Sequence, residues 1–230
     1  MKKFINILWV ALGSVLLLAA CKKDGYRNDG GPSNEFVNMT TYDFLRSHPK
    51  FDSLVRIIDH AGMKDEVNGN VTFFVTTNWG GADYVSAKKQ QKIIEVQDEN
   101  IAFSIDSIPA QELRDSLKMY LFEGPITREN LTTEGAYFVS KLGPQDSVRF
   151  RIRLRRVFAY PDFLDYVDYV NFTKVIGTLD SDELDPNSIP QNQRDRSFDC
   201  QTSGIITTTG VIHVLSGDHR LFFNEQPMAN

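Results

Sequence analysis

The spacing of apolar residues predicts helices in the first half of the chain. A short helix is expected over Tyr42–Ser47, and Pro49 interrupts it. The next helix covers about Lys50–Gly62, because its apolar residues follow the i, i+3, i+4, i+7 pattern of one helix face. These residues are Phe51, Leu54, Val55 and Ile58. Gly62 then stands where a helix C-terminus favours a left-handed residue.

Two further helices are expected before the pattern changes. Ala87–Val96 has a weakly helical pattern, and Pro109 is well placed in the first turn of a helix that Gly124 and Pro125 end. The apolar residues of this second helix are Leu113, Leu117, Tyr120 and Leu121.

Strands are expected where β-branched and aromatic residues cluster or alternate with polar ones. Val71–Thr77 is such a cluster, bounded by Asn78–Gly81. Tyr166–Thr178 is a second candidate strand. Leu179–Asp199 is polar, contains two prolines and is expected to be a long loop. Helices first and strands later indicate an α+β fold rather than alternating βαβ units.

A tight hairpin is expected near the C-terminus, because Thr209-Gly210 lies between Ile205–Thr208 and Val211–Leu215. We expect Ile205, Ile212 and Val214 to be buried. Gly210 is expected to have a positive φ, which a β-branched residue adopts only at a cost.

The clearest strand alternates apolar residues with arginines. Its apolar residues are Val148, Phe150, Ile152 and Leu154, and the arginines are Arg149, Arg151, Arg153 and Arg155. Successive side chains of a strand point to opposite faces, so the arginines share one face. They can clamp the carboxylates or sulfates of an acidic glycan. Alternatively, they pair across the sheet with acidic residues, for which the nearby candidates are Asp162, Asp165 and Asp168.

Aromatic residues and a histidine provide further candidate positions. Tyr160, Tyr166 and Tyr169, together with Phe163, either form a platform on which a sugar stacks or pack at the core and edge of a sheet. His213 stands between Ile212 and Val214 and points away from both. It is either a ligand-binding or pH-sensing group, or a packed histidine whose ring bonds a nearby loop.

The N-terminus has the layout of a secretory signal. Lys2 and Lys3 precede an apolar run over Phe4–Leu17, and small residues lead into Cys21. The segment Leu18–Cys21 resembles the lipobox of bacterial lipoproteins, which implies that the Cys21 thiol is acylated. The apolar run is shorter than the ~20 residues that span a bilayer.

The domain limits follow from this interpretation. Residues 1–20 form the lipoprotein signal peptide, 21–38 a polar, glycine-rich flexible tether, 39–224 one domain and 225–230 a C-terminal tail. The chain has 25 Lys and Arg residues against 30 Asp and Glu. Loss of Lys2 and Lys3 with the signal changes the net charge from −5 to −7, which argues against nucleic acid as a partner.

The sequence favours neither a metal site nor an enzyme. His48, His60 and His219 lack the spacing of a zinc motif. Asp180, Asp182 and Asp185 resemble a calcium loop only superficially, because the further ligand positions are not filled by suitable residues. We expect no cofactor. Once Cys21 carries lipid, Cys200 has no disulfide partner within the chain and is expected to be a small buried apolar residue.

Taken in order, these pieces resemble the fasciclin-type adhesion domain (FAS1). The resemblance rests on the turn Ala61–Asp65, the strand Thr72–Asn78 and the closing segment Thr209–Leu215. It covers about Met39 to Phe223. In these motifs Asn78, Gly210, Ile212 and His213 are expected to have structural roles.

The chain also departs from the family. The Tyr-His pair that many members carry on the central helix is half absent, because Leu121 follows Tyr120. Thr77 replaces the usual proline before the asparagine, and Leu179–Asp199 is expected to be an insertion. The segment Cys200–Gly204 resembles a variant common in lipoproteins of the Bacteroidetes.

The resemblance implies a small wedge of two β-sheets flanked by short helices, in a binding and adhesion module without shared catalytic residues. We therefore expect a lipid-anchored protein of the outer membrane whose ligand is a glycan or a surface protein. Whether the domain faces the cell surface or the periplasm stays open. The alternative is a structural accessory subunit of an outer-membrane glycan-uptake complex that contacts only protein. The sequence leaves the partner, the oligomeric state and the role of the insertion open.

Overall fold

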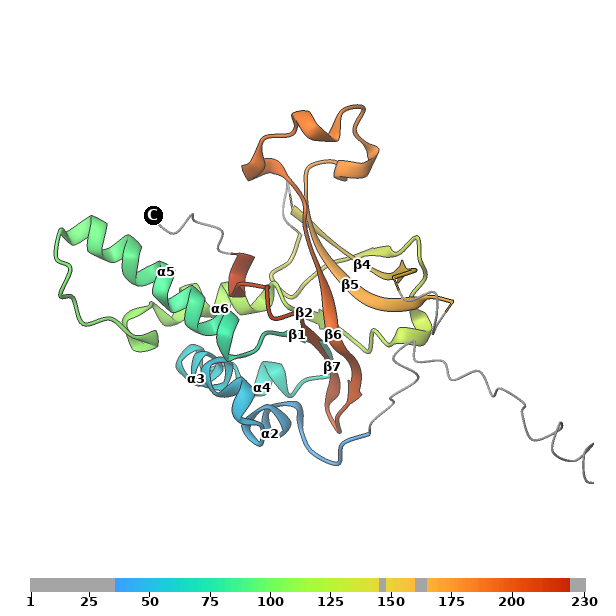
Figure 1. Cartoon of the computed structure of the whole chain (residues 1–230). Helices are drawn as coiled ribbons and strands as arrows, with labels where there is room; N and C mark the ends of the chain where they lie inside the picture. Colours follow the sequence, from blue (N-terminus) through green and yellow to red (C-terminus); the bar gives the residue numbers. More distant parts are fainter. Residues whose placement is uncertain (1–35, 145–147, 160–164, 224–230) are drawn as a thin grey trace, which may run out of the picture.

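The computed structural model describes residues 36–144, 148–159 and 165–223, with helices gathered on one side of a strongly bent set of strands (Figure 1). The α-helices are α2 (Thr41–Arg46), α3 (Asp52–Ala61), α4 (Lys64–Val67), α5 (Asn78–Val96) and α6 (Ala110–Lys118). The strands are β1 (Val71–Val75), β2 (Leu121–Glu123), β3 (Ala136–Phe138), β4 (Val148–Val157), β5 (Val167–Ile176), β6 (Arg196–Ile206) and β7 (Gly210–Leu215). The 3-10 turns are η1 (Pro49–Phe51), η2 (Ile105–Ser107), η3 (Arg128–Asn130), η4 (Asp180–Asp182), η5 (Pro186–Ser188), η6 (Gln191–Gln193) and η7 (Leu221–Phe223).

The strands follow the order β2-β1-β7-β6-β5-β4-β3, and only β1 and β7 run parallel. Strand β6 belongs to two sheets: its part Arg196–Asp199 pairs with β5, and Cys200–Ile206 pairs with β7. A bridge between Phe122 of β2 and Ser140, which follows β3, also brings the two ends of this strand order together. The fold is therefore α+β, a wedge of two sheets joined by β6 and flanked by helices, as expected.

The core between the two sheets is aromatic. Phe74 of β1 stacks on Phe172 of β5 with ring centroids 4.5 Å apart, and Phe172 in turn stacks on Phe150 of β4 at 5.5 Å. Phe122 of β2 meets all three rings edge-on. Such ring pairs contribute about 0.5–1.5 kcal/mol beyond the area that they bury. The apolar face of the alternating strand β4 is thus used to close the wedge.

Helix α3 confirms the helical pattern found in the sequence. Leu54, Val55 and Ile58 are buried, and Gly62 ends the helix with a φ of 65°. The first turn differs, because Phe51 belongs to the 3-10 turn η1 and the α-helix begins only at Asp52.

Two helices differ from expectation. Helix α5 begins at Asn78 rather than Ala87, so the segment Asn78–Gly81 is its first turn and not a separate turn. Its two glycines weaken the helical signal in the sequence, but Gly81 is needed where α5 meets α3: a Cβ there would lie 3.0 Å from the Cβ of Ser53. Helix α6 ends at Lys118, because Leu121 instead begins β2 and pairs with Phe73.

The expected loop Leu179–Asp199 is partly wrong. Its last residues, Arg196–Asp199, form the start of β6 and pair with Asn171–Lys174 of β5. The remainder carries the short turns η4, η5 and η6 and projects from the end of the β5–β6 pair (Figure 1, orange). The candidate strand Tyr166–Thr178 is confirmed, with the narrower limits Val167–Ile176.

The closing hairpin is confirmed, and Ile205, Ile212 and Val214 are buried. The expected conformation of Gly210 is wrong, since it is not among the glycines with positive φ. Glycine is needed there for a different reason. A Cβ on Gly210 would lie 2.2 Å from the carbonyl oxygen of Val71, where β7 runs beside β1.

The described chain begins beside this hairpin. Phe36 forms a parallel bridge with Ile206, and the Val37 amide donates to the Ile206 carbonyl at 2.8 Å. Phe36 and Val37, which we assigned to the end of the tether, are therefore paired with β6.

Candidate functional site

The candidate site is the outward face of β4, where the predicted alternation is observed. Phe150 and Ile152 are buried in the core, whereas the four arginines between them and beside them are partly or largely exposed. We call Arg149, Arg151, Arg153 and Arg155 the arginine row. Their cross-strand neighbours on β5 are Val175, Thr173, Asn171 and Tyr169. On the other side, Tyr137 of β3 lies opposite Arg151.

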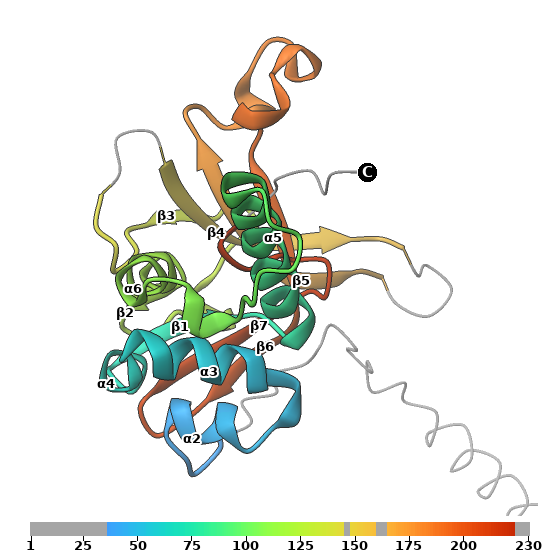
Figure 2. The same cartoon turned by 90° about the vertical axis from the view of Figure 1, so that its left-hand side faces the viewer.

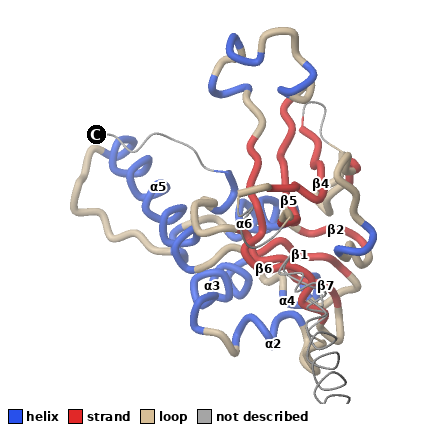
Figure 3. Tube along the Cα trace, turned by 45° about the vertical axis from the view of Figure 1, so that its right-hand side comes forward, coloured by secondary structure: helices blue, strands red, loops and turns tan. Residues whose placement is uncertain are grey.

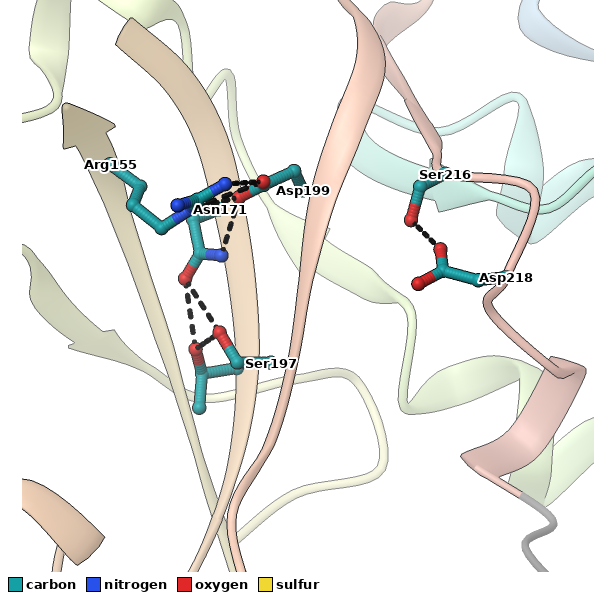
Figure 4. A network of polar contacts seen from close by, with 7 residues as sticks. Arg155, Asn171, Ser197, Asp199, Ser216 and Asp218 are labelled. Atoms are coloured by element: carbon teal, nitrogen blue, oxygen red, sulfur yellow. Dashed lines mark hydrogen bonds and ion pairs between the residues drawn. The ribbon is translucent and has the colours of Figure 1, made fainter. Parts of the chain in front are cut away.

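Arg155 forms the ion pair of this face. Its guanidinium bonds both carboxylate oxygens of Asp199, with Nε 2.8 Å from Oδ1, and Asn171 donates to the same carboxylate at 2.8 Å (Figure 4). Burial raises the pKa of Asp199, but the hydrogen bonds from Arg155 and Asn171 outweigh this effect and hold the pKa below its usual value. Asp199 is thus a fixed, ionised partner of one arginine.

Asp199 was not among the acidic partners suggested by the sequence. Of those, Asp168 pairs with Arg156, a residue on the opposite face of β4, with both oxygens at 2.9 Å. Asp165 forms no ion pair within the described part of the chain, and Asp162 lies outside the described residues. The cross-sheet pairing of the arginine row is therefore correct for Arg155 only.

Arg149 and Arg151 are held by backbone carbonyls. Arg149 donates to Gly177 at 3.0 Å, and its guanidinium lies 4.4 Å from the centre of the Tyr137 ring. Arg151 donates to the carbonyl of Glu134. A carbonyl accepts a hydrogen bond but carries no net charge, so both side chains are oriented without forming an ion pair within the described ranges.

Arg153 lies between these partners and has a distinct environment. Its Nε is buried without a hydrogen-bond partner, and Gly135 lets the chain cross closely, since a Cβ there would lie 2.5 Å from the Cβ of Arg153. Burial lowers the pKa of Arg153, and the neighbouring charges of Arg151 and Arg155 lower it further. The row thus holds adjacent cations that repel one another.

The candidate tyrosines do not form one platform. Tyr169 faces the arginine row, with the Arg155 guanidinium 5.9 Å from its ring centre. Tyr166 is instead covered by Arg156 at 3.6 Å, near the opposite face, and Tyr160 lies outside the described residues. Sequence reasoning missed Tyr137, which is 46% exposed beside the row. Its position follows from the β3–β4 pairing, which the sequence did not reveal.

His213 is a packed core residue. Its Nε2 donates to the carbonyl of Ile126 at 2.8 Å, its Nδ1 accepts from the amide of Gly204, and its ring stacks on Phe74. Burial lowers its pKa to about 4. These contacts fit the interpretation of a histidine that bonds a nearby loop, and they occupy both ring nitrogens.

Asn78 joins two helices. Its side-chain oxygen accepts from the Ser53 amide at 2.8 Å, and its nitrogen donates to the Pro49 carbonyl at 2.6 Å. It therefore fixes the start of α5 against the start of α3.

Tyr120 has a histidine partner that the sequence did not indicate. Its hydroxyl lies 2.9 Å from Nε2 of His219, which is 99 positions away along the chain, and both residues are buried. Burial lowers the pKa of His219 to about 3, and its Nδ1 has no hydrogen-bond partner. The pair ties the C-terminal turn η7 to the core rather than presenting a surface.

Cys200 is buried, as predicted. Burial raises the pKa of its thiol well above the usual value, so the thiol stays protonated and uncharged. Within residues 36–144, 148–159 and 165–223, no group of three or more His, Cys, Asp or Glu side chains is placed to hold a metal ion.

Comparisons with known proteins give a limited result. No model of a protein family matches the chain, and no curated protein matches it. Among solved structures, a FAS1 domain pair from the insect cell adhesion molecule fasciclin I is similar over 80% of this chain, with 16% identity and a TM-score of 0.46. The chain spans about half the length of that structure.

Proposed function

We propose that this chain is a lipid-anchored binding or adhesion protein of the cell envelope, of fasciclin type, which holds an acidic glycan on the arginine row. The observation that carries this proposal is the charge of that face. Among the described residues, a carboxylate pairs with Arg155, whereas the other three arginines form no ion pair. Three neighbouring arginines that form no ion pair in the described part of the chain, whose net charge is −5 over its full length, mark a place for an anionic partner.

The geometry of the row suits a repeating anion. Alternate residues of a strand lie about 6.6 Å apart, so the guanidinium groups form a line along β4. Arginine binds carboxylates and sulfates through two parallel hydrogen bonds, which favours it over a simple point charge. Tyr137 and Tyr169 flank the line, each with an arginine of the row over one face of its ring, so a sugar would stack on the opposite face. Binding an anion would also relieve the repulsion around Arg153.

The double substitution Arg151→Gln and Arg153→Gln tests this site. We expect it to abolish binding to a polyuronate while changing the free energy of unfolding by no more than ~1 kcal/mol. Neither arginine forms an ion pair among the described residues, and the buried Nε of Arg153 has no hydrogen bond to lose. A matched double substitution, Arg46→Gln and Lys118→Gln, removes the same charge from helices α2 and α6 and should leave binding intact. Binding would be measured by calorimetry at low salt.

If the double Gln variant binds the polyuronate normally, the arginine row is only a solvated sheet face and the proposed site is wrong. If no acidic glycan binds and the chain instead co-purifies with an outer-membrane receptor, the accessory-subunit alternative replaces the proposal.

The lipid anchor rests on Cys21 and its resemblance to a lipobox. In the described part of the chain, no helix is both long and apolar enough to cross a bilayer. Cys21 and Phe36 lie 15 positions apart, which limits the distance between them to about 50 Å when that segment is fully extended. Phe36 pairs with Ile206 of β6, near the β6–β7 hairpin, whereas β4 pairs with β5 and lies above β6 and β7 in Figure 3.

We expect Cys21→Ala to leave a soluble or uncleaved precursor, because no thiol remains to carry the lipid. Metabolic labelling with a fatty acid and membrane fractionation would measure this. Cys200→Ala, which removes the other cysteine, should keep the label. A Cys21→Ala protein that is still matured and membrane-bound would contradict the anchor, and protease treatment of intact cells would distinguish surface from periplasmic display.

A further inference from the structure

A pocket lies on the helical side of the molecule, apart from the arginine row. It is a pocket of about 360 Å³ between α3, the first half of α5 and the turn η2. Successive turns of α5 supply Val85, Ser86 and Lys89. Ser53 and Arg56 come from α3, and Ile105 of η2 also lines the pocket. None of these residues belongs to the arginine row.

The crossing of the two helices creates this pocket. A Cβ on Gly81 of α5 would lie 3.0 Å from the Cβ of Ser53 and 3.9 Å from Cδ1 of Ile57, so the two helices pack closely at this crossing. From there α5 runs up and away from α3 (Figure 2), and Arg56 of α3 and Lys89 of α5 both line the pocket. The floor of the space is apolar, with Val85 and Ile105 below a polar rim.

The polar groups of the rim have few partners. Within the described residues, the Lys89 ammonium and the Ser53 and Ser86 hydroxyls form no hydrogen bond or ion pair. Arg56 is 63% exposed and has one long ion pair, with Asp106 at 4.0 Å. Asp106 also lies 3.9 Å from His60 and is itself largely exposed, so it competes weakly for Arg56.

We propose that this pocket binds a small hydroxylated anion of the size and chemistry of a hexuronate. Arg56 and Lys89 would hold the carboxylate, Ser53 and Ser86 would hydrogen-bond ring hydroxyls, and the C–H face of the ring would lie on Val85 and Ile105. The volume is at the lower end of the range for small-molecule sites, about 300–1,000 Å³, and an apolar floor with a few convergent polar groups is typical of them. The pocket would thus recognise one sugar unit, independently of the row.

Titration of the domain with glucuronate and with glucose, followed by amide NMR, tests the pocket. Glucuronate should shift the amides of Gly81 and Val85, and glucose should bind at least about tenfold more weakly, because it lacks the charge that Arg56 and Lys89 recognise. Arg56→Gln with Lys89→Gln should weaken glucuronate binding about tenfold. Lys92→Gln, on the same helix but paired with Glu95 outside the pocket, should leave it unchanged.

A steric variant provides an independent readout. Ala82→Phe fills the rim of the pocket and should abolish glucuronate binding, whereas Gln90→Phe, also exposed on α5, should not. The double Gln variant of Arg151 and Arg153 should still bind glucuronate here, which separates this inference from the proposed function. Equal affinity for both sugars, no binding, or shifts confined to β4 would overturn it.

Discussion

Lowering the pH from 7.5 to 5 should reduce the free energy of unfolding by about 4 kcal/mol, through two buried histidines. Burial lowers the pKa of His213 from 6.5 to about 4 and that of His219 to about 3. Below pH 6.5, both histidines therefore become protonated in the unfolded chain but stay neutral in the folded chain. Stability is full above pH 6.5 and falls as the pH drops towards the folded-state values, by about 2 kcal/mol for each histidine at pH 5.

The contacts explain the resistance of His213 to protonation. Nδ1 accepts from the Gly204 amide, so a proton on this nitrogen would face another N–H group inside the core. Asp195 acts in the opposite direction, because burial raises its pKa, and it offsets part of the loss. Urea unfolding at pH 7.5, 6 and 5 measures the slope. His213→Gln should roughly halve it, and a stability that stays constant over this range would contradict the account.

Ile212→Ala should lower the free energy of unfolding by ~2–5 kcal/mol, because the substitution removes packing and leaves a cavity. Ile212 is fully buried on β7, where it lies between Phe73 of β1 and Ile205 of β6. It therefore supports the central strand pairings of the first sheet. Chemical unfolding followed by fluorescence gives the midpoint and slope.

The control for this change is Val139→Ala, which truncates an apolar side chain that is 63% exposed after β3. It should change stability by less than ~0.5 kcal/mol. An unchanged midpoint for Ile212→Ala would mean that β7 is peripheral to the folded core.

Local patterns predicted much of this fold. The apolar spacing of α3, the left-handed Gly62, the alternation of β4 and the hairpin around Thr209-Gly210 all depend on neighbours within a few residues. Helix α5 was missed in part because its glycines serve packing against α3, which the local sequence does not show. The need for glycine at position 210 was attributed to a positive φ. In the structure it comes from the close approach of Val71, a residue of another strand.

The partners of the candidate site depended on long-range pairing. The exposed row of arginines followed from strand periodicity, but Asp199 came from a segment assigned to a loop, 44 positions beyond Arg155. Likewise, Tyr137 joins the row only through the pairing of β3 with β4. Whether an arginine is paired with a carboxylate depends on its neighbours in space. The sequence therefore suggested both glycan binding and cross-sheet pairing for the row, but it could not show which arginine has a carboxylate partner.

A salt titration of polyuronate binding tests the central claim most directly. If the arginine row carries the interaction, affinity should fall steeply as salt rises from 0.1 M to 1 M, because the Debye length falls from ~10 Å to ~3 Å. Replacing Arg151 and Arg153 with Gln should remove most of this dependence together with the binding. An affinity that is nearly indifferent to salt would contradict the account and would place recognition on aromatic stacking instead.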